Sequence, residues 1–130
     1  MQNLTGKAAL VTGSTDGVGR LVARKLGQAG ARVLVHGRDA ERGARVVAEI
    51  EAGGGTASFL AADLSSLEEV RRLAGAVQAT VGRLDILINN SVGILRTHFA
   101  RQLIELLRTT SVSQAGMFIP TSPAFPSSTG

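Results

Sequence analysis

A glycine-rich turn near the start of the chain has the residue types and spacing of an anion-binding site. It reads TGSTDGVG over residues 12–19, after the apolar run 8–11 and before a stretch, 18–29, that is predicted to be helical. Glycines let the backbone bend tightly and approach an anion. The N-terminus of the following helix offers that anion unpaired N–H groups and a positive dipole end. Strand, turn and helix in this order predict a dinucleotide pyrophosphate site.

The glycine spacing defines the candidate residues of this turn. The pattern is Gly13-x3-Gly17-x-Gly19, which differs from the G-x-G-x-x-G fingerprint of many dinucleotide sites. An ordinary strand-to-helix turn is the alternative for a glycine pattern taken alone. The candidate cofactor-binding residues here are Gly13, Ser14, Thr15, Gly17, Val18 and Gly19.

The end of the second predicted strand, residues 31–36, bears on cofactor choice. In dinucleotide sites an acidic side chain at this place accepts hydrogen bonds from the adenosine ribose and selects NAD. Here Gly37 takes that place and Arg38 follows it. A guanidinium can pair with a 2′-phosphate, so the segment favours NADP over NAD, with a surface arginine as the alternative. Asp39 is expected to cap the next helix.

Polar residues also follow the third and fourth predicted strands, residues 56–61 and 84–89. Asp63 and Leu64 come after the third strand, and Asn89 and Asn90 end the fourth. Taken alone, Asp63 is equally well explained as an acid at a helix N-terminus beside Ser65. A capping-box pattern, with Glu68 three residues after this serine, predicts that a helix begins there and reaches about residue 81.

These segments, in this order over residues 6–93, resemble the cofactor-binding half of the short-chain dehydrogenase/reductase family. The matching elements are the T-G-x3-G-x-G turn, a D-[VL] pair at residues 63–64 and a fourth strand of the form L-D-x-L-[IV]-N-N ending like N-N-A-G. The resemblance implies that Asp63 and the next backbone amide hold adenine, and that Asn89 and Asn90 stabilise the sheet edge and line the ribose site. Ser91 and Val92 depart from N-N-A-G. Asp16 stands where NADP-binding relatives often carry a basic residue.

The resemblance implies hydride transfer at a nicotinamide, with a tyrosine as acid or base and a lysine four residues later. This chain contains no tyrosine, and its lysines, Lys7 and Lys25, precede or fall within the first predicted helix. No catalytic residue is therefore assigned, and His98 is more typical of a surface position. We expect a truncated form that binds NADP(H) but does not turn over substrate alone. The alternatives are a non-catalytic nucleotide-binding or interaction domain, a non-functional fragment, or a partner chain that supplies the missing pair.

Strand and helix signals alternate through the first 90 residues. They predict an α/β fold of the Rossmann type, three αβα layers around a parallel sheet of about four strands in the order 3-2-1-4. The regions expected are an NAD(P)-binding region at 1–93, a divergent amphipathic helix at 94–110 and a Pro/Ser/Thr-rich disordered tail at 111–130. The fourth strand would then be an exposed edge, which invites self-association.

Composition narrows the remaining classes. The chain has 130 residues, no cysteine and a net charge of +4, which excludes disulfide frameworks and cysteine metal sites; no metal site is expected. The arginines are scattered and aromatic residues make up 3%, so no nucleic-acid partner is expected. No segment has the length of a membrane span or a signal peptide, which favours a cytoplasmic protein. The substrate cannot be derived from these residues.

Overall fold

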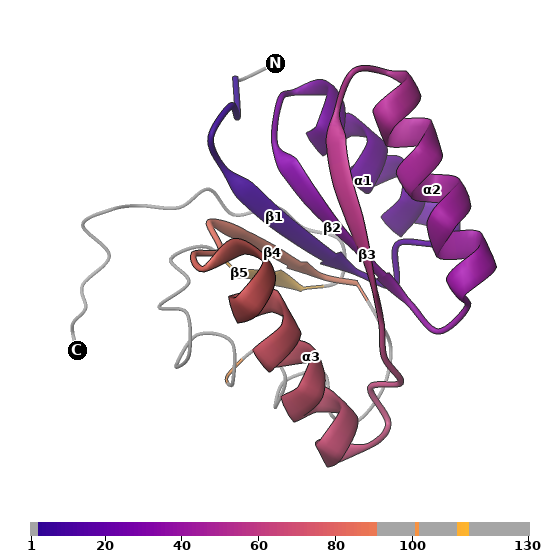
Figure 1. Cartoon of the computed structure of the whole chain (residues 1–130), viewed down its shortest axis with the longest axis vertical. Coiled ribbons are helices and arrows are strands. Elements are labelled where there is room, and N and C mark those ends of the chain that lie inside the picture. The colour runs from indigo at the N-terminus through magenta and orange to yellow at the C-terminus, as the bar shows by residue number, and fades with distance from the viewer. Residues whose placement is uncertain (1–2, 91–100, 102–111, 115–130) are drawn as a thin grey trace.

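The computed structural model, which describes residues 3–90, 101 and 112–114, contains one parallel sheet with helices on both faces (Figure 1). Five strands lie in the order β3-β2-β1-β4-β5. The elements are β1 (Ala8–Thr12), α1 (Gly17–Gln28), β2 (Arg32–Gly37), α2 (Ala40–Ala52), β3 (Thr56–Ala61), α3 (Leu67–Val81), β4 (Ile86–Asn89) and β5 (Val112–Gln114). The predicted α/β class and the order 3-2-1-4 of the first four strands are confirmed.

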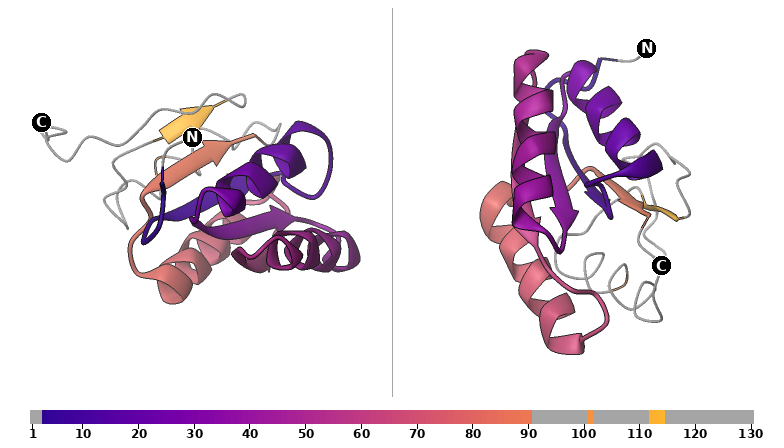
Figure 2. Two further views of the ribbon diagram at one scale, coloured as in Figure 1. Left: turned by 90° about the horizontal axis from the view of Figure 1, so that it is seen from above. Right: turned by 90° about the vertical axis from the view of Figure 1, so that its right-hand side faces the viewer.

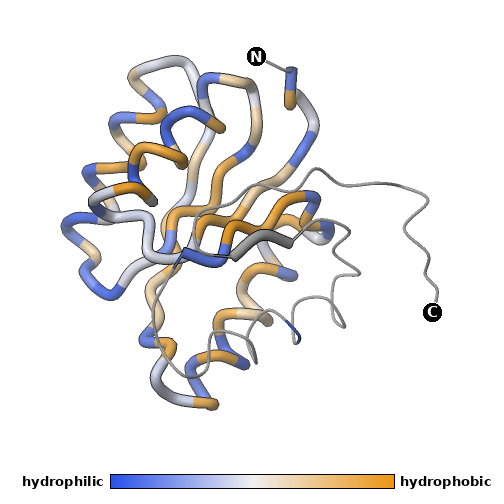
Figure 3. The backbone as a smooth tube through the Cα atoms, turned by 180° about the vertical axis from the view of Figure 1, so that it is seen from behind, coloured by the Kyte–Doolittle hydropathy of each residue, from blue (hydrophilic) through white to orange (hydrophobic). Residues whose placement is uncertain are grey.

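The central strands bury both of their faces, which explains their continuous apolar runs. On one face, α1 and α2 pack with Ala23 and Ile50 against Val11 and its neighbours. On the other face, α3 packs with Leu73 against Leu10 and its neighbours. The two layers are visible in Figure 2, and Figure 3 shows hydrophobic residues along the central strands and hydrophilic ones in many of the outer turns.

The helix starts follow local capping. Asp39 caps α2 as predicted, because its carboxylate accepts hydrogen bonds from the N–H groups of Glu41 at 2.9 Å and Arg42 at 3.2 Å. The predicted capping box of α3 is wrong by one residue. Ser66 is the N-cap and its hydroxyl accepts a bond from the Glu69 N–H.

The sheet extends one strand beyond the predicted four. β5 pairs in parallel with β4, with Leu87 opposite Val112 and Asn89 opposite Gln114. The prediction that β4 would be an exposed edge is therefore wrong, and that basis for self-association is removed. Residues 112–114 also fall inside the range 111–130 that was expected to be disordered. The rest of that range, and the helix predicted at 94–110 apart from residue 101, lie outside the described residues.

Parallel strands place their carboxyl ends at one edge of the sheet. The turn after β1, the Arg38 segment after β2 and the Asp63 segment after β3 therefore meet there. Within the described residues no helix is both long and apolar enough to cross a membrane.

Candidate cofactor-binding site

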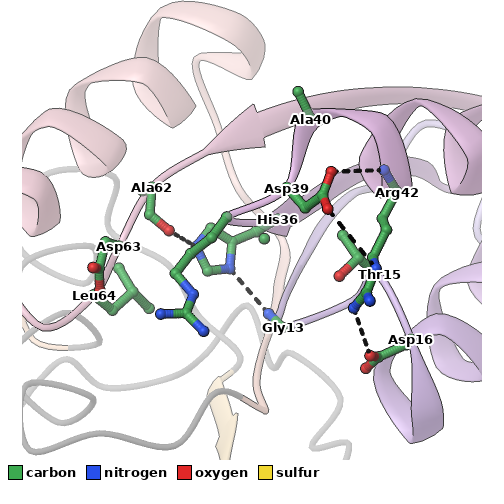
Figure 4. A pocket seen from close by; sticks show the side chains of 12 residues that line it. Gly13, Thr15, Asp16, His36, Asp39, Ala40, Arg42, Ala62, Asp63 and Leu64 are labelled. Atoms are coloured by element: carbon green, nitrogen blue, oxygen red, sulfur yellow. Dashed lines mark hydrogen bonds and ion pairs between the residues drawn. The ribbon is translucent and has the colours of Figure 1, made fainter.

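An open pocket of about 930 Å³ lies at this carboxyl edge (Figure 4). Its walls come from the turn after β1, from the end of β2 with the start of α2, and from the segment after β3. The lining residues are Gly13, Thr15, Asp16, His36, Gly37, Arg38, Asp39, Ala40, Arg42, Ala62, Asp63 and Leu64. Among the predicted site residues, Gly13, Thr15, Arg38, Asp63 and Leu64 line this pocket, whereas Ser14, Gly17, Val18, Gly19, Asn89 and Asn90 do not.

The glycine turn is built for tight bending and for an open helix start. Gly13 and Gly17 have φ values of 63° and 59°, in the left-handed region that favours glycine. Asp16 is the N-cap residue of α1, yet its side chain makes no capping hydrogen bond. The first-turn N–H groups of α1 therefore receive no bond from the N-cap side chain, which leaves them open to an anion.

Gly19 serves close packing rather than the pocket wall. A Cβ on this residue would overlap the Gly13 carbonyl oxygen and lie 2.7 Å from Asn90 Nδ2. Gly37 lines the pocket and also permits close packing, because a Cβ there would lie 2.5 Å from Thr15 Cγ2. A small residue at the end of β2 thus lets the glycine turn approach the strand.

Ser14 faces the strand instead of the pocket. It is fully buried, its N–H donates to the His36 carbonyl at 2.8 Å, and its hydroxyl accepts from the His36 N–H at 2.9 Å. Ser14, which was predicted to bind cofactor, therefore holds the turn against the backbone of β2.

His36 lies between the glycine turn and the segment after β3, and it was not among the predicted site residues. Its side chain is 3% exposed. Gly13 N–H donates to Nδ1 at 2.9 Å, and Nε2 lies 3.0 Å from the Ala62 carbonyl oxygen. Burial lowers the pKa of His36, and the bond to Ala62 partly opposes that effect. The sequence signal for His36 was a titratable residue inside the otherwise apolar run VLVHG, residues 33–37.

Asn89, the last residue of β4, and Asn90, which follows it, contact the end of β1 and the start of the turn. Thr12 Oγ1 donates to Asn89 Oδ1 at 3.0 Å in the interior, and the Asn90 N–H donates to Thr12 Oγ1 at 2.8 Å. Asn90 Nδ2 donates to the Gly13 carbonyl at 3.3 Å. These contacts fix the end of β1 and fit the sheet-stabilising role expected of both asparagines.

The outer wall of the pocket carries exposed charges. Arg42 pairs with Asp16 across the pocket mouth, Nη1 to Oδ2 at 3.4 Å, and lies 3.9 Å from Asp39 Oδ2. Arg38 takes part in none of the ion pairs between described residues. Arg42 was not among the predicted site residues, although its position three residues after the Asp39 cap places it on the first turn of α2.

Asp63 makes local contacts ahead of α3 and also lines the pocket. Its Oδ1 accepts bonds from the Ser65 N–H at 3.0 Å and the Ser65 hydroxyl at 2.8 Å, as a residue preceding a helix would. These bonds lower the pKa of Asp63, and the nearby Arg38 charge lowers it further. Asp63 is thus an anion that also lines the pocket.

Comparison with known proteins identifies the family. The family model described as short chain dehydrogenase matches residues 7–128. The chain belongs to the short-chain dehydrogenase/reductase family. This match continues past residue 93, where the recognised motifs stop, so the family resemblance is broader than the motifs alone indicate.

Curated relatives agree with the family match. The chain is 43% identical over 93 residues to a 3beta-hydroxysteroid dehydrogenase of Mediterraneibacter gnavus, covering 70% of this chain and 34% of that protein. It is 38% identical over 128 residues to the human dehydrogenase/reductase SDR family member 13, covering 97% of this chain and 33% of that protein. The chain therefore spans about a third of the length of these relatives.

Solved structures share the fold. A metagenomic short-chain oxidoreductase in complex with NADP matches with a TM-score of 0.71 at 35% identity, over 82% of this chain and 57% of that one. The NADP complex of RhlG from Pseudomonas aeruginosa matches with a TM-score of 0.70 at 32% identity, over 83% and 50%. In the part of this chain that the structure describes, no three His, Asp or Glu side chains form a metal-binding group.

Proposed function

We propose that this chain binds NADP in the pocket at the carboxyl edge of the sheet, as the cofactor-binding part of an NAD(P)-dependent oxidoreductase. The observation that carries the proposal is the joint presence in one pocket of the glycine turn, Arg38 and Asp63. These three features come from three different strands, and each matches one part of an adenine dinucleotide. The family membership and the NADP-bound structural relatives support the same assignment.

Each group of predicted site residues would bind a different part of NADP. The turn residues Gly13, Ser14, Thr15, Gly17, Val18 and Gly19 would form and support the pyrophosphate site, with the first turn of α1 as the source of N–H donors. Arg38 would pair with the 2′-phosphate, and Asp63 and Leu64 would hold the adenine. Asn89 and Asn90 would act near the ribose through the turn that they fix. When bound, the nicotinamide supplies the hydride donor or acceptor.

The preference for NADP over NAD rests on the charges of the outer wall. Asp16 repels a 2′-phosphate, and this residue argued against NADP at the level of sequence. Its carboxylate is paired with Arg42, which compensates that charge. Arg38 retains a guanidinium without an ion pair among the described residues. This combination favours a phosphate over a plain ribose hydroxyl.

We further propose that the 130-residue chain tested by itself binds cofactor without catalysing hydride transfer. It contains no tyrosine, and losing a matched proton donor typically costs a factor of about 10² to 10⁴ in rate. A non-catalytic nucleotide-binding role is the second candidate, and the same absence of tyrosine favours it. The division into a cofactor-binding region at 1–93 with a separate C-terminal part stays a proposal, as does a cytoplasmic location.

The test is a thermal melt of the purified chain with excess NADP and, separately, with excess NAD. A ligand that binds only the folded state stabilises it by about 2.7 kcal/mol at a hundredfold excess over its dissociation constant. A cooperative melt that NADP raises more than NAD is expected. Absence of any shift with either nucleotide would contradict the proposal, and measurable NADPH oxidation with carbonyl substrates would contradict the inactivity of the isolated chain.

A further inference from the structure

The His36 side chain connects two walls of the pocket that are far apart in sequence. Gly13 belongs to the glycine turn after β1, and Ala62 directly precedes Asp63 after β3. The imidazole lies between them and contacts both, Nδ1 with the Gly13 N–H and Nε2 with the Ala62 carbonyl oxygen. Figure 4 shows the ring between these two segments. The phosphate turn and the adenine segment are thus linked through one side chain.

One protonation state alone satisfies both contacts. The Gly13 N–H is a donor, so Nδ1 must carry a lone pair, and the Ala62 carbonyl is an acceptor, so Nε2 must carry a hydrogen. A proton added at Nδ1 would place two hydrogen-bond donors, Nδ1–H and the Gly13 N–H, against each other, because the two nitrogens are 2.9 Å apart. The imidazolium cannot keep the bond to Gly13, while its bond to Ala62 remains available.

The surroundings keep the ring neutral at ordinary pH. Burial lowers its pKa, because the interior disfavours the charged form. The charged groups of the same pocket are Asp16 on the turn, Arg38 and Asp39 after β2, Arg42 on α2 and Asp63 after β3. The turn and the segment after β3 each contribute a carboxylate, α2 contributes a guanidinium, and only the segment after β2 contributes both signs.

We propose that His36 is a positioning residue whose neutral imidazole sets the spacing between the glycine turn and the Asp63 segment, so that dinucleotide affinity falls when the ring is protonated. The inference rests on the proposed function and adds a pH dependence to it. His36 acts through Gly13 and Ala62, and the Gly13 N–H is taken up by the ring. The phosphate donors must then come from later residues of the turn.

Calorimetry tests this inference. It measures the binding of NAD and of NADP to the full chain at pH values from about 8 to about 5. The apparent dissociation constant should rise by up to about tenfold for each pH unit below the ring's titration, because the binding-competent fraction falls in that proportion. The rise should occur with both nucleotides. A change seen with NADP alone would come from its own phosphate, whose second pKa is about 6, and would overturn the inference.

Three variants separate the histidine from the rest of the protein. His36→Asn keeps an oxygen that can accept the Gly13 N–H bond but cannot titrate, so its affinity should lose the pH dependence. His36→Leu removes both contacts and should bind at least about tenfold more weakly at every pH. His98→Gln, which changes the chain's other histidine, should behave as the wild type. An unchanged pH profile in His36→Asn overturns the inference.

A spectroscopic measurement makes the test independent of whether His36→Leu folds. Nitrogen-15 NMR of the histidine rings should report the Nε2–H tautomer at neutral pH, and the Gly13 amide signal should shift at the pH where affinity falls. An amide signal that stays constant through the titration overturns the inference even where binding is intact. Absence of nucleotide binding by the wild type at about pH 8 instead overturns the proposed function, and this inference with it.

Discussion

The two walls of the pocket are built in opposite ways. The inner wall is the buried layer that supports the pocket, of which only His36 lines the pocket itself. In this layer uncharged groups are hydrogen-bonded in pairs, Thr12 with Asn89 and Ser14 with His36, and all four residues are buried. The outer wall carries charged side chains, and its Arg42–Asp16 pair is exposed by 57% and 73%. A broken bond in the inner wall leaves a buried polar group unsatisfied, which costs about 1–3 kcal/mol. An exposed ion pair typically contributes about 0–1 kcal/mol.

This difference indicates that one wall sets the shape of the pocket and the other sets its choice between nucleotides. The inner wall fixes where the glycine turn lies, because its hydrogen bonds are made by buried groups. The outer wall can exchange its partners for a ligand at little cost, because the charges are already solvated. Changes inside should therefore alter folding and affinity for every nucleotide, whereas changes outside should alter the choice between nucleotides.

The largest effect is expected for Gly19→Ala, which breaks the inner wall. The new Cβ would overlap the Gly13 carbonyl oxygen, and overpacking of this kind costs about 1–3 kcal/mol of unfolding free energy. Urea denaturation measures the loss. Gly75→Ala is the matched control, since nothing lies within 4 Å of its Cβ, and it should stabilise by about 0.5–1 kcal/mol. Equal behaviour of both variants would show that the close packing at Gly19 has no energetic weight.

Arg38→Asp should change selection while leaving shape intact. Loss of a charge-assisted bond to the 2′-phosphate should weaken NADP binding by about 10- to 100-fold, and NAD binding should change far less. Calorimetric titration with both nucleotides measures the ratio. Arg45→Asp makes the same charge change on the exposed side of α2. If Arg45→Asp weakens NADP binding equally, the effect is long-range and Arg38 makes no local contact.

Acidification should weaken the inner wall before any carboxylate responds. The folded-state pKa of His36 lies below the ordinary value of 6.5, so the unfolded chain binds more protons once the pH falls below about 6.5. Unfolding free energy should drop by up to about 1.4 kcal/mol per pH unit in that window. Asp63 and Glu69, whose pKa values are lowered by hydrogen bonds, should contribute a separate loss in more acid solution.

Chemical denaturation at a series of pH values measures this slope. His36→Asn should flatten the part of the curve that begins near the ordinary histidine pKa, and His98→Gln serves as the control. An identical slope in His36→Asn and the wild type would assign the loss to other groups.

The smallest effect is expected for Asp16→Asn. Removing this carboxylate releases Arg42 and reduces repulsion of the 2′-phosphate, so NADP affinity should rise by about two- to fivefold at low salt. Stability should change by less than about 0.5 kcal/mol, because the pair is exposed. A titration at low and high salt measures both the gain and its screening. Weaker NADP binding in this variant would mean that the Asp16–Arg42 pair itself positions the turn.

Most features that were predicted from the sequence depend on local residue patterns. The glycine turn and the Asp39 cap were predictable because a few neighbouring residues determine them. The start of α3 was misplaced because Ser65 and Ser66 each precede a glutamate by three residues, and the pattern alone cannot choose between them. The structure resolves the choice, since Asp63 engages Ser65 and leaves Ser66 to cap the helix.

The missed features all join residues distant in sequence. The His36 ring contacts residues from the turn after β1 and the segment after β3, and Arg42 on α2 pairs with Asp16 of the turn after β1. β5 has three residues that include serine and glutamine, so its composition gives little strand signal. It is recognised by its pairing with β4, which no periodicity within the strand can reveal.

The position of β1 has a consequence for synthesis of the chain. β1 is the first strand made, yet it lies between β2 and β4. The Ala8 N–H donates a hydrogen bond to the carboxylate of Asp85, which is 77 residues later in the sequence. At a translation rate of roughly 5–20 residues per second, one side of β1 waits for roughly 4–15 seconds on the ribosome. During that interval one edge of β1 has unpaired N–H and C=O groups beside exposed apolar side chains, which makes the growing chain prone to aggregation.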